Sequence, residues 1–204
     1  DKPYKKYDRE GLFLRVTPRG SKLWGYRYRI GDVDRILSLG AYPEISLAQA
    51  RDKRDDARKL ARNGTDPCVK KQEAKLDRYL RVLENTPTQT LSGNEQFAFF
   101  INAYNAWTIK LILTGYPGVK SIKDLGSLLQ SPWKKEFVRI NGKTLTLDDI
   151  EHTILRPRFK DPRVHFAIVC ASKSCPPLIA EPYLGAVLDA QLNRSARDFL
   201  NTPA

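Results

Sequence analysis

The first third of the chain alternates between apolar and polar positions, a pattern typical of β-strands. Two runs show it most plainly, and a third follows at residues 35–39. The turns "TPRGS" and "GDVD" separate the three runs. Each run places its apolar members on one strand face: Leu12, Leu14 and Val16 in the first, and Trp24, Tyr26, Tyr28 and Ile30 in the second. We therefore predict a small three-stranded antiparallel sheet.

The spacing becomes helical after "GAYPEI". Ser46 followed by Gln49 is a capping-box signature, and "NG" and "DP" end the pattern. The predicted apolar positions of this helix are Leu47, Ala50, Ala57 and Leu60 or Ala61. A single helix covers one sheet face, so we expect the aromatic face to pack on it. The opposite face then carries Phe13, Arg15, Arg27 and Arg29, with the three arginines exposed.

The rest of the chain has a different character. Residues 76–83 predict a short helix, and Ser92 with Glu95 forms a second capping box. The following residues, 97–113, are apolar on several sides and predict a central, buried helix. It contains Asn102 and Asn105, which either anchor neighbouring loops or face a site, anchoring being the commoner role of a buried amide.

Beyond this helix the pattern predicts a strand pair, another helix and a last strand. The pair consists of residues 137–140 and 144–145 around an "NG" turn. The helix begins near Leu147, with carboxylates in its first turn and His152 after them. Residues 164–170 are apolar on both faces, as in a buried strand. The fold class is thus α+β: a small sheet with one helix (1–66), a linker (67–75), and a larger mixed helical α+β domain (76–204).

Charge distinguishes the two parts. Residues 1–75 hold 19 Lys and Arg against 11 Asp and Glu, net +8, and residues 76–204 hold 16 against 12, net +4. A strongly basic small module indicates a polyanionic partner, the alternative being an ordinary solvated basic face. A β-ribbon fits the major groove of DNA, where arginine contacts phosphates and guanine edges. The predicted DNA-binding residues are Arg15, Arg27, Arg29, Lys22 and Arg19.

Other classes of protein fit the composition less well. No run approaches the ~18 apolar residues that a membrane helix needs, so we expect no membrane partner. Three cysteines and no secretory segment indicate a reducing compartment, hence a cytoplasmic protein. The histidines and cysteines match no usual zinc spacing, and no cofactor or metal is expected. The chain has no methionine and begins at Asp1, so we expect a fragment.

The stretch "GLFLRVTPRGSKLWGYRYRIGDVDRILSLGAYPEISLAQARDKRDDARKLARNGTDP" closely resembles the amino-terminal arm-type DNA-binding module of phage-type tyrosine integrases, domain of unknown function 4102. The resemblance implies a three-stranded sheet with a helix that binds arm-type DNA sites. A recombinase of this family also needs a catalytic domain with an arginine, a His-x-x-Arg box and a nucleophilic tyrosine. In "EHTILRPR", His152 and Arg156 are separated by three residues, so we predict no active recombinase.

"HFAIVCASKSCPPL" at residues 165–178 raises the possibility of thiol chemistry. A nucleophilic thiol needs a base and a group that orients that base. The candidates are Cys170 or Cys175, His152 or His165, and Glu151 or Asp149.

In a regular strand His165 and Cys170 point to opposite faces, which makes His152 the better base and His165 a core or supporting residue. Cys175 is a rival nucleophile in a loop. A buried structural thiol and, outside the cytosol, a disulfide are the alternatives. Cys68 is interpreted as an incidental thiol.

Three further blocks, "NEQFAFFINAYNAWTIKLIL", "LTLDDIEHTILRPRF" and "DPRVHFAIVCASKSCPPL", together resemble the bacterial family called domain of unknown function 547, which usually continues beyond "ARDFLN". Its His, Cys and Glu motifs imply a relationship to papain-like or transglutaminase-like thiol enzymes. We therefore predict a fusion of a DNA-binding module with a thiol hydrolase or acyltransferase of unknown substrate. The alternative is a non-catalytic binding or structural carboxy-terminal domain beside the remnant of an integration event.

Overall fold

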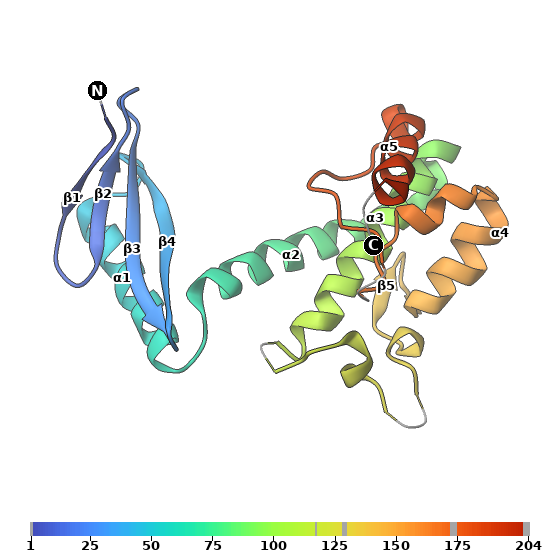
Figure 1. Ribbon diagram of the computed structural model, residues 1–204, viewed down its shortest axis with the longest axis horizontal. Coiled ribbons are helices and arrows are strands. Elements are labelled where there is room, and N and C mark those ends of the chain that lie inside the picture. The colour runs from blue at the N-terminus through green and yellow to red at the C-terminus, as the bar shows by residue number, and fades with distance from the viewer. Residues whose placement is uncertain (1, 117, 128–129, 172–174, 202–204) are drawn as a thin grey trace. The chain divides into compact units, whose positions relative to one another are not determined.

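The computed structural model describes residues 2–116, 118–127, 130–171 and 175–201. It divides the chain into two compact units, Asp1–Ala74 and Lys75–Ala204 (Figure 1). Both are mixed in secondary structure, which confirms the α+β class. The predicted linker, residues 67–75, lies in helix α2, Pro67–Asn85.

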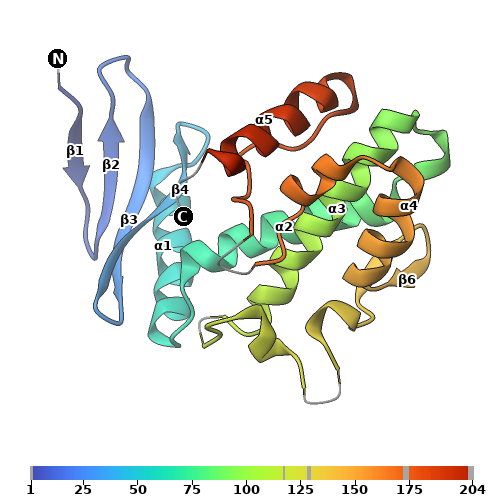
Figure 2. The same cartoon turned by 45° about the vertical axis from the view of Figure 1, so that its right-hand side comes forward.

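The first unit is an antiparallel sheet with a helix on one face (Figure 2). Its elements are β1 (Tyr4–Tyr7), β2 (Leu12–Val16), β3 (Lys22–Ile30), β4 (Val33–Tyr42) and α1 (Leu47–Arg62), with strand order β1-β2-β3-β4. The predicted count of three strands is therefore wrong. The missed strand, β1, has the sequence "YKKY" and is exposed throughout, so no apolar alternation marks it. It is held by its pairing with β2.

The core of this unit lies between α1 and the aromatic side of the sheet, as predicted. Its buried members are Leu12, Trp24, Tyr26, Tyr28, Leu37, Leu39, Ala50 and Ala57. The Trp24 indole donates a 2.8 Å hydrogen bond to the carbonyl of Ile45. The Ser46–Gln49 capping box is confirmed. Leu47, predicted to be apolar packing, is 39% exposed, and the buried side chains of α1 include Arg54 instead.

The second unit is built around α3 (Gly93–Leu113), which is buried on most of its sides and starts at the predicted Ser92–Glu95 capping box. The remaining elements are the short strands β5 (Val138–Ile140) and β6 (Lys143–Leu145), a π-helix (Asp149–Leu155), α4 (Arg156–Phe159), α5 (Leu188–Leu200), and 3₁₀ turns at Thr88–Thr90, Ile122–Leu125, Pro132–Lys134, Pro162–Phe166 and Gly185–Val187. The helix that was predicted near Leu147 begins there and becomes π-helical at Asp149.

Asn102 and Asn105 of α3 each anchor a distant loop, which confirms the anchoring interpretation. The Asn102 amide donates to the carbonyl of Tyr183 at 2.8 Å and accepts from its N–H at 2.9 Å. The Asn105 amide donates to the Ala167 carbonyl at 2.9 Å and accepts from the Val169 N–H at 2.8 Å. Each amide thus replaces a segment of backbone as a hydrogen-bonding partner.

The predicted strand at residues 164–170 is not formed. Pro162–Phe166 is a 3₁₀ helix, begun by the Asp161 carboxylate, which accepts a 2.9 Å hydrogen bond from the Arg163 N–H. His165 was predicted as a core or supporting residue; it is exposed, so the core part of that prediction is wrong. The apolar run is buried at Val164, Ala167 and Ile168, a spacing that a turn satisfies as well as a strand does.

Candidate functional site

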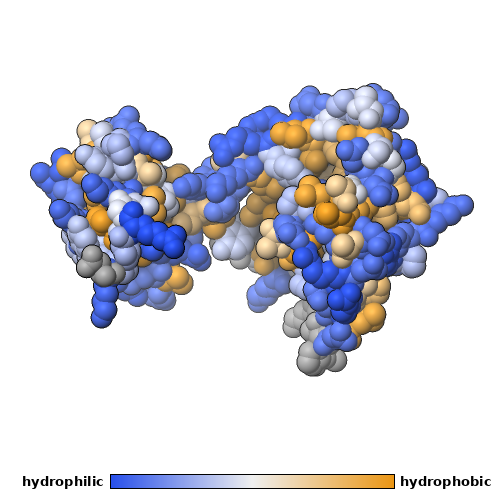
Figure 3. All heavy atoms as spheres, turned by 90° about the horizontal axis from the view of Figure 1, so that it is seen from above, coloured by the Kyte–Doolittle hydropathy of each residue, from blue (hydrophilic) through white to orange (hydrophobic). Residues whose placement is uncertain are grey.

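One face of the sheet in the first unit is not covered by α1. Strand pairing places Arg15 opposite Lys5 and Leu23, and Arg27 opposite Ile36, so these side chains share that face. We call it the open face; its members are Lys5, Tyr7, Phe13, Arg15, Leu23, Gly25, Arg27, Arg29, Asp34 and Ile36. Figure 3 shows hydrophilic side chains interspersed with small apolar areas over the unit that carries the N-terminus. Arg15, Arg27 and Arg29 are exposed, as predicted.

Phe13 forms the base of the open face. It is 3% exposed because its ring lies on Gly25, where an added Cβ would come within 2.4 Å of the ring. The Lys5 ammonium lies 4.6 Å from the Phe13 ring centroid, and the Tyr7 ring lies 5.9 Å away. The strand that the sequence did not reveal therefore adds a cation and an exposed aromatic ring to this face.

Ion pairs hold two of the arginines on this face. Arg27 lies 2.9 Å from Asp34, and Arg29 lies 3.6 Å from Asp32. The hydrogen bond to Asp34 raises the pKa of Arg27 above its usual value. Both pairs are largely exposed and hence weak, so a phosphate can replace either carboxylate.

The other predicted basic residues differ in their placement. Arg15 makes no ion pair within the described part of the chain, and Arg19 lies in the turn after β2. Lys22 shares strand parity with Trp24 and places its ammonium 5.4 Å from the Tyr42 ring centroid. It therefore lies off the open face, and only three of the five predicted residues share that face.

The second unit has a small polar cavity of about 190 Å³. It is lined by Tyr104, Ser131, Trp133, Asp148, Glu151, His152 and Cys170. The structure thus brings three of the predicted catalytic residues, Cys170, His152 and Glu151, around one space. Asp149 does not line it, because its carboxylate accepts hydrogen bonds from the Thr146 N–H and hydroxyl at 2.9 and 2.8 Å.

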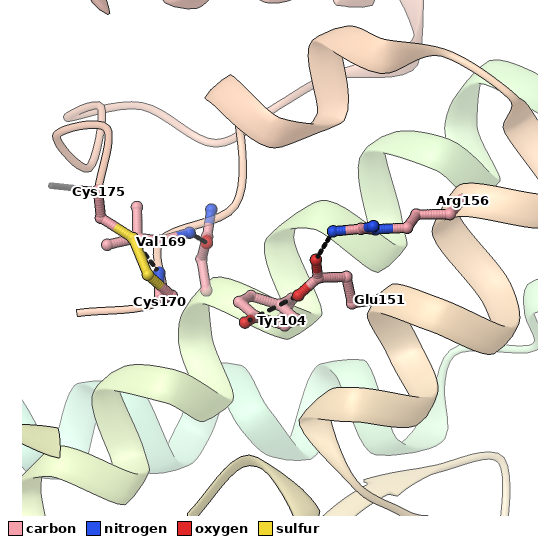
Figure 4. Close-up of a disulfide and its surroundings, with 7 residues drawn as sticks. Tyr104, Glu151, Arg156, Val169, Cys170 and Cys175 are labelled. Carbon is pink, nitrogen blue, oxygen red and sulfur yellow. Dashed lines mark hydrogen bonds and ion pairs between the residues drawn. A yellow bond between two sulfur atoms is a disulfide. The ribbon is translucent and has the colours of Figure 1, made fainter. Parts of the chain in front are cut away.

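Both carboxylate oxygens of Glu151 have hydrogen-bonding partners (Figure 4). One accepts a 2.5 Å hydrogen bond from Arg156, and the other accepts a 3.4 Å hydrogen bond from the hydroxyl of Tyr104. Burial, together with the charge of Glu151, raises the pKa of Tyr104, so this hydroxyl is a neutral donor. His152 Nε2 lies 3.8 Å from Asp148 and 4.0 Å from Glu151, close enough for attraction when protonated.

Cys170 and Cys175 form a disulfide (Figure 4). Both cysteines were predicted as candidate nucleophilic thiols, with a disulfide between them as an alternative; the structure has the disulfide, and Cys68 is the one free cysteine within the described residues. The backbone N–H of Cys170 donates to Cys175 Sγ at 2.9 Å. The preceding residue, Val169, is the one anchored by Asn105.

Several residues at this site were not predicted from the sequence: Tyr104, Ser131 and Trp133, which line the cavity, and Arg156, which pairs with Glu151. In the sequence Tyr104 looks like any other aromatic residue of a buried helix, and it is indeed only 1% exposed. Arg156 lies five residues after Glu151, outside the three- or four-residue spacing of ion pairs on an α-helix, so no sequence signal marked this pair. Throughout the described ranges no cluster of ligands suits a metal ion, and no helix has the length and apolar content to cross a bilayer.

Comparison with known proteins identifies both units. Residues 88–200 match the family described as protein of unknown function DUF547, which is 113 of the 204 residues, more than half of the chain. The chain belongs to this family. Residues 1–74 match the family described as arm DNA-binding domain, so both resemblances drawn from the sequence are confirmed.

Relatives among curated proteins match the first unit. Putative protein IntB of Escherichia coli (strain K12) is 50% identical over 66 residues, 32% of this chain and 17% of the relative. The integrase of Enterobacteria phage P4 is 46% identical over 79 residues, 38% of this chain and 18% of its own length. The integrase of Shigella phage Sf6 is 43% identical over 72 residues, 35% and 19% respectively. The chain thus spans less than a fifth of these relatives.

Proposed function

We propose that the first unit binds duplex DNA through its open face. The observation that supports this most strongly is the strand register, which gathers Lys5, Arg15, Arg27 and Arg29 on the sheet face that no helix covers. The match to arm DNA-binding domains and the similarity to integrases favour the same partner. β-strands can enter the major groove as a ribbon, where cations on the strands meet phosphates and base edges.

The cations on this face differ in whether they must break an ion pair to bind DNA. Arg15 and Lys5 meet phosphates without leaving a carboxylate, whereas Arg27 and Arg29 exchange Asp34 and Asp32 for phosphate. Because both ion pairs are largely exposed, breaking either of them costs little. Each neutralised phosphate releases counterions, so affinity falls with salt at a logarithmic slope near −0.9 per contact.

The test is the salt dependence of duplex binding by the full chain, with Arg27 and Arg29 both replaced by alanine. We expect the slope to become shallower by up to about 1.8, two contacts at 0.9 each. The matched control is Lys59→Ala with Arg62→Ala, which removes the same charge from exposed positions on α1. Equal weakening in both double variants indicates a general charge effect, and unchanged binding in the first removes the open face as the interface. Circular dichroism checks that each variant is folded.

A second candidate function, a thiol hydrolase or acyltransferase in the second unit, is favoured by the cavity that Cys170, His152 and Glu151 share. In this proposal His152 takes the thiol proton, and Glu151, fixed by Arg156 and Tyr104, stabilises the imidazolium that results. The relationship to papain-like or transglutaminase-like enzymes belongs to this proposal. A purely binding or structural role is the alternative.

Chemical labelling of the reduced full chain tests this second function. Iodoacetamide should modify Cys170 faster than Cys68 near neutral pH, because an adjacent imidazole lowers a thiol's pKa. His152→Ala should slow that reaction, whereas His165→Ala, at an exposed position outside the cavity, should leave it unchanged. Faster labelling at Cys175 assigns the nucleophile there, and uniformly slow labelling of all three cysteines contradicts a catalytic thiol.

A further inference from the structure

We propose that Cys170 and Cys175 are a redox-active pair, whose disulfide small thiols reduce and re-form in the folded protein. The oxidised pair holds the sulfur of Cys170, a residue that lines the cavity, in the disulfide, and the reduced pair frees that thiol. The proposed redox exchange depends only on the position and surroundings of the two cysteines. Its consequence for reactivity rests on the second proposed function.

The position of the disulfide makes it accessible to a small reagent. Cys170 lines the cavity of about 190 Å³, and both cysteines are partly exposed. Neither belongs to the buried hydrophobic cluster of the second unit, whose members on α3 and on the π-helix pack without them. A thiol can therefore approach the S–S bond without opening the core.

The bond closes a short loop, so its stabilising effect as a cross-link is at the low end for disulfides. Its cysteines are five positions apart, and the stabilisation that a disulfide provides through the unfolded chain grows with the length of the loop it closes. Structural disulfides in small domains usually join distant segments, and this one does not. A cysteine pair in a chain with just one further cysteine, Cys68, is also unlike a disulfide scaffold.

Hydrogen bonds around the pair favour exchange at one sulfur. The Asn105 amide holds Val169, so Cys170 keeps its place at the cavity wall when the bond opens. The Cys170 N–H points at Cys175 Sγ from 2.9 Å, and an N–H donor stabilises negative charge on a sulfur. Cys175 is thus the better leaving group, and the incoming thiolate should attack Cys170.

The exchange balances with a thiol of the glutathione class as the reductant. Its thiolate attacks Cys170 Sγ, the Cys170–Cys175 bond breaks, and Cys175 leaves as a thiolate that takes up a proton. A second reagent thiolate then attacks the reagent's sulfur in the mixed disulfide, and Cys170 leaves as a thiolate that takes up a proton. The two reagent thiols leave as one disulfide. Two electrons pass to the protein, and an excess of the reagent disulfide reverses both steps.

The experiment equilibrates the full chain, in the absence of denaturant, with mixtures of reduced and oxidised glutathione. After an acid quench, N-ethylmaleimide labels the free thiols, and peptide mass spectrometry reports each cysteine separately. We expect Cys170 and Cys175 to change together, from mostly disulfide to mostly thiol, with circular dichroism unchanged. Cys68 is the internal control and should form no disulfide with Cys170 or Cys175 at any ratio of the two glutathione forms. In the Cys175→Ser variant, Cys170 should instead accumulate the mixed disulfide with glutathione.

Two results would overturn the proposal. If the pair stays oxidised in millimolar dithiothreitol until urea unfolds the chain, the disulfide is structural. If both cysteines stay reduced in excess oxidised glutathione, the bond does not form in solution. The thiol function fails separately: the pair then interconverts as expected, but reduced Cys170 reacts with iodoacetamide no faster than Cys68 in the same sample.

Discussion

Replacing Asn105 by leucine should destabilise the second unit more than any surface change of similar size. The side chain is 7% exposed and supplies both hydrogen-bonding partners of the segment before Cys170, the Ala167 carbonyl and the Val169 N–H. Leucine has the same number of side-chain heavy atoms and no polar atom, so both backbone groups lose their partner. An unsatisfied buried group costs about 1–3 kcal/mol, which gives a loss of roughly 2–6 kcal/mol for the two groups. Some added apolar burial by leucine places the expected value near the middle of that range.

Urea unfolding of the full chain, followed by far-ultraviolet circular dichroism, measures this loss. With a slope of about 1–3 kcal/mol per molar urea, the midpoint of the second unit should fall by roughly 1–2 M. Hydrogen exchange should also quicken in the peptide that contains Val169. Asn94→Leu is the matched control, since it lies at an exposed position of the same helix and should change stability by less than ~0.5 kcal/mol. A similarly small change for Asn105→Leu would refute the anchoring argument.

Two further changes probe each unit separately. Gly25→Ala places a Cβ against the Phe13 ring, at 2.4 Å from its nearest atom, and should cost about 1–3 kcal/mol in urea unfolding and weaken DNA binding, whereas Gly93→Ala meets open space and should cost little. Asp161→Asn should cost about 1 kcal/mol at neutral pH, because the hydrogen bonds from Arg163 lower the pKa of Asp161 below 3.8. A lowered folded-state pKa gives stability that is present above the unfolded value and lost as pH falls through the folded one. The difference from wild type should therefore vanish in acid, and a constant difference across pH would contradict it.

Local rules predicted most of the fold. Alternation at residues 12–16 and 24–30 placed two strands and their buried faces, and the serines at 46 and 92 marked two helix starts. These succeeded because a strand face or a helix cap depends on residues two to four positions apart. Strand β1 was missed for the complementary reason: all four of its residues are exposed, so pairing alone defines it. That omission removed Lys5 and Tyr7 from the predicted interface.

The sequence predicted the candidate catalytic residues of the cavity but not the other residues that line it. Residue type alone nominated Cys170, His152 and Glu151, and the structure places all three around one space. Tyr104 could not be distinguished from other aromatic residues of a buried helix, because its role depends on a hydroxyl that meets Glu151 from 47 positions away. Arrangements of that kind follow from packing and leave no periodic trace in the sequence.

The apolar run from Val164 to Cys170 was predicted to be a buried strand, and the structure forms a 3₁₀ helix and a turn instead. Continuous apolar character requires burial, and the structure does bury Val164, Ala167 and Ile168. A strand additionally requires a neighbouring strand to pair its backbone, since buried N–H and carbonyl groups must be satisfied. Here Asn105, more than sixty positions earlier, satisfies two of those groups with one amide. The chain is therefore free to turn, and that turn is what brings the sulfur of Cys170 to the cavity beside His152 and Glu151.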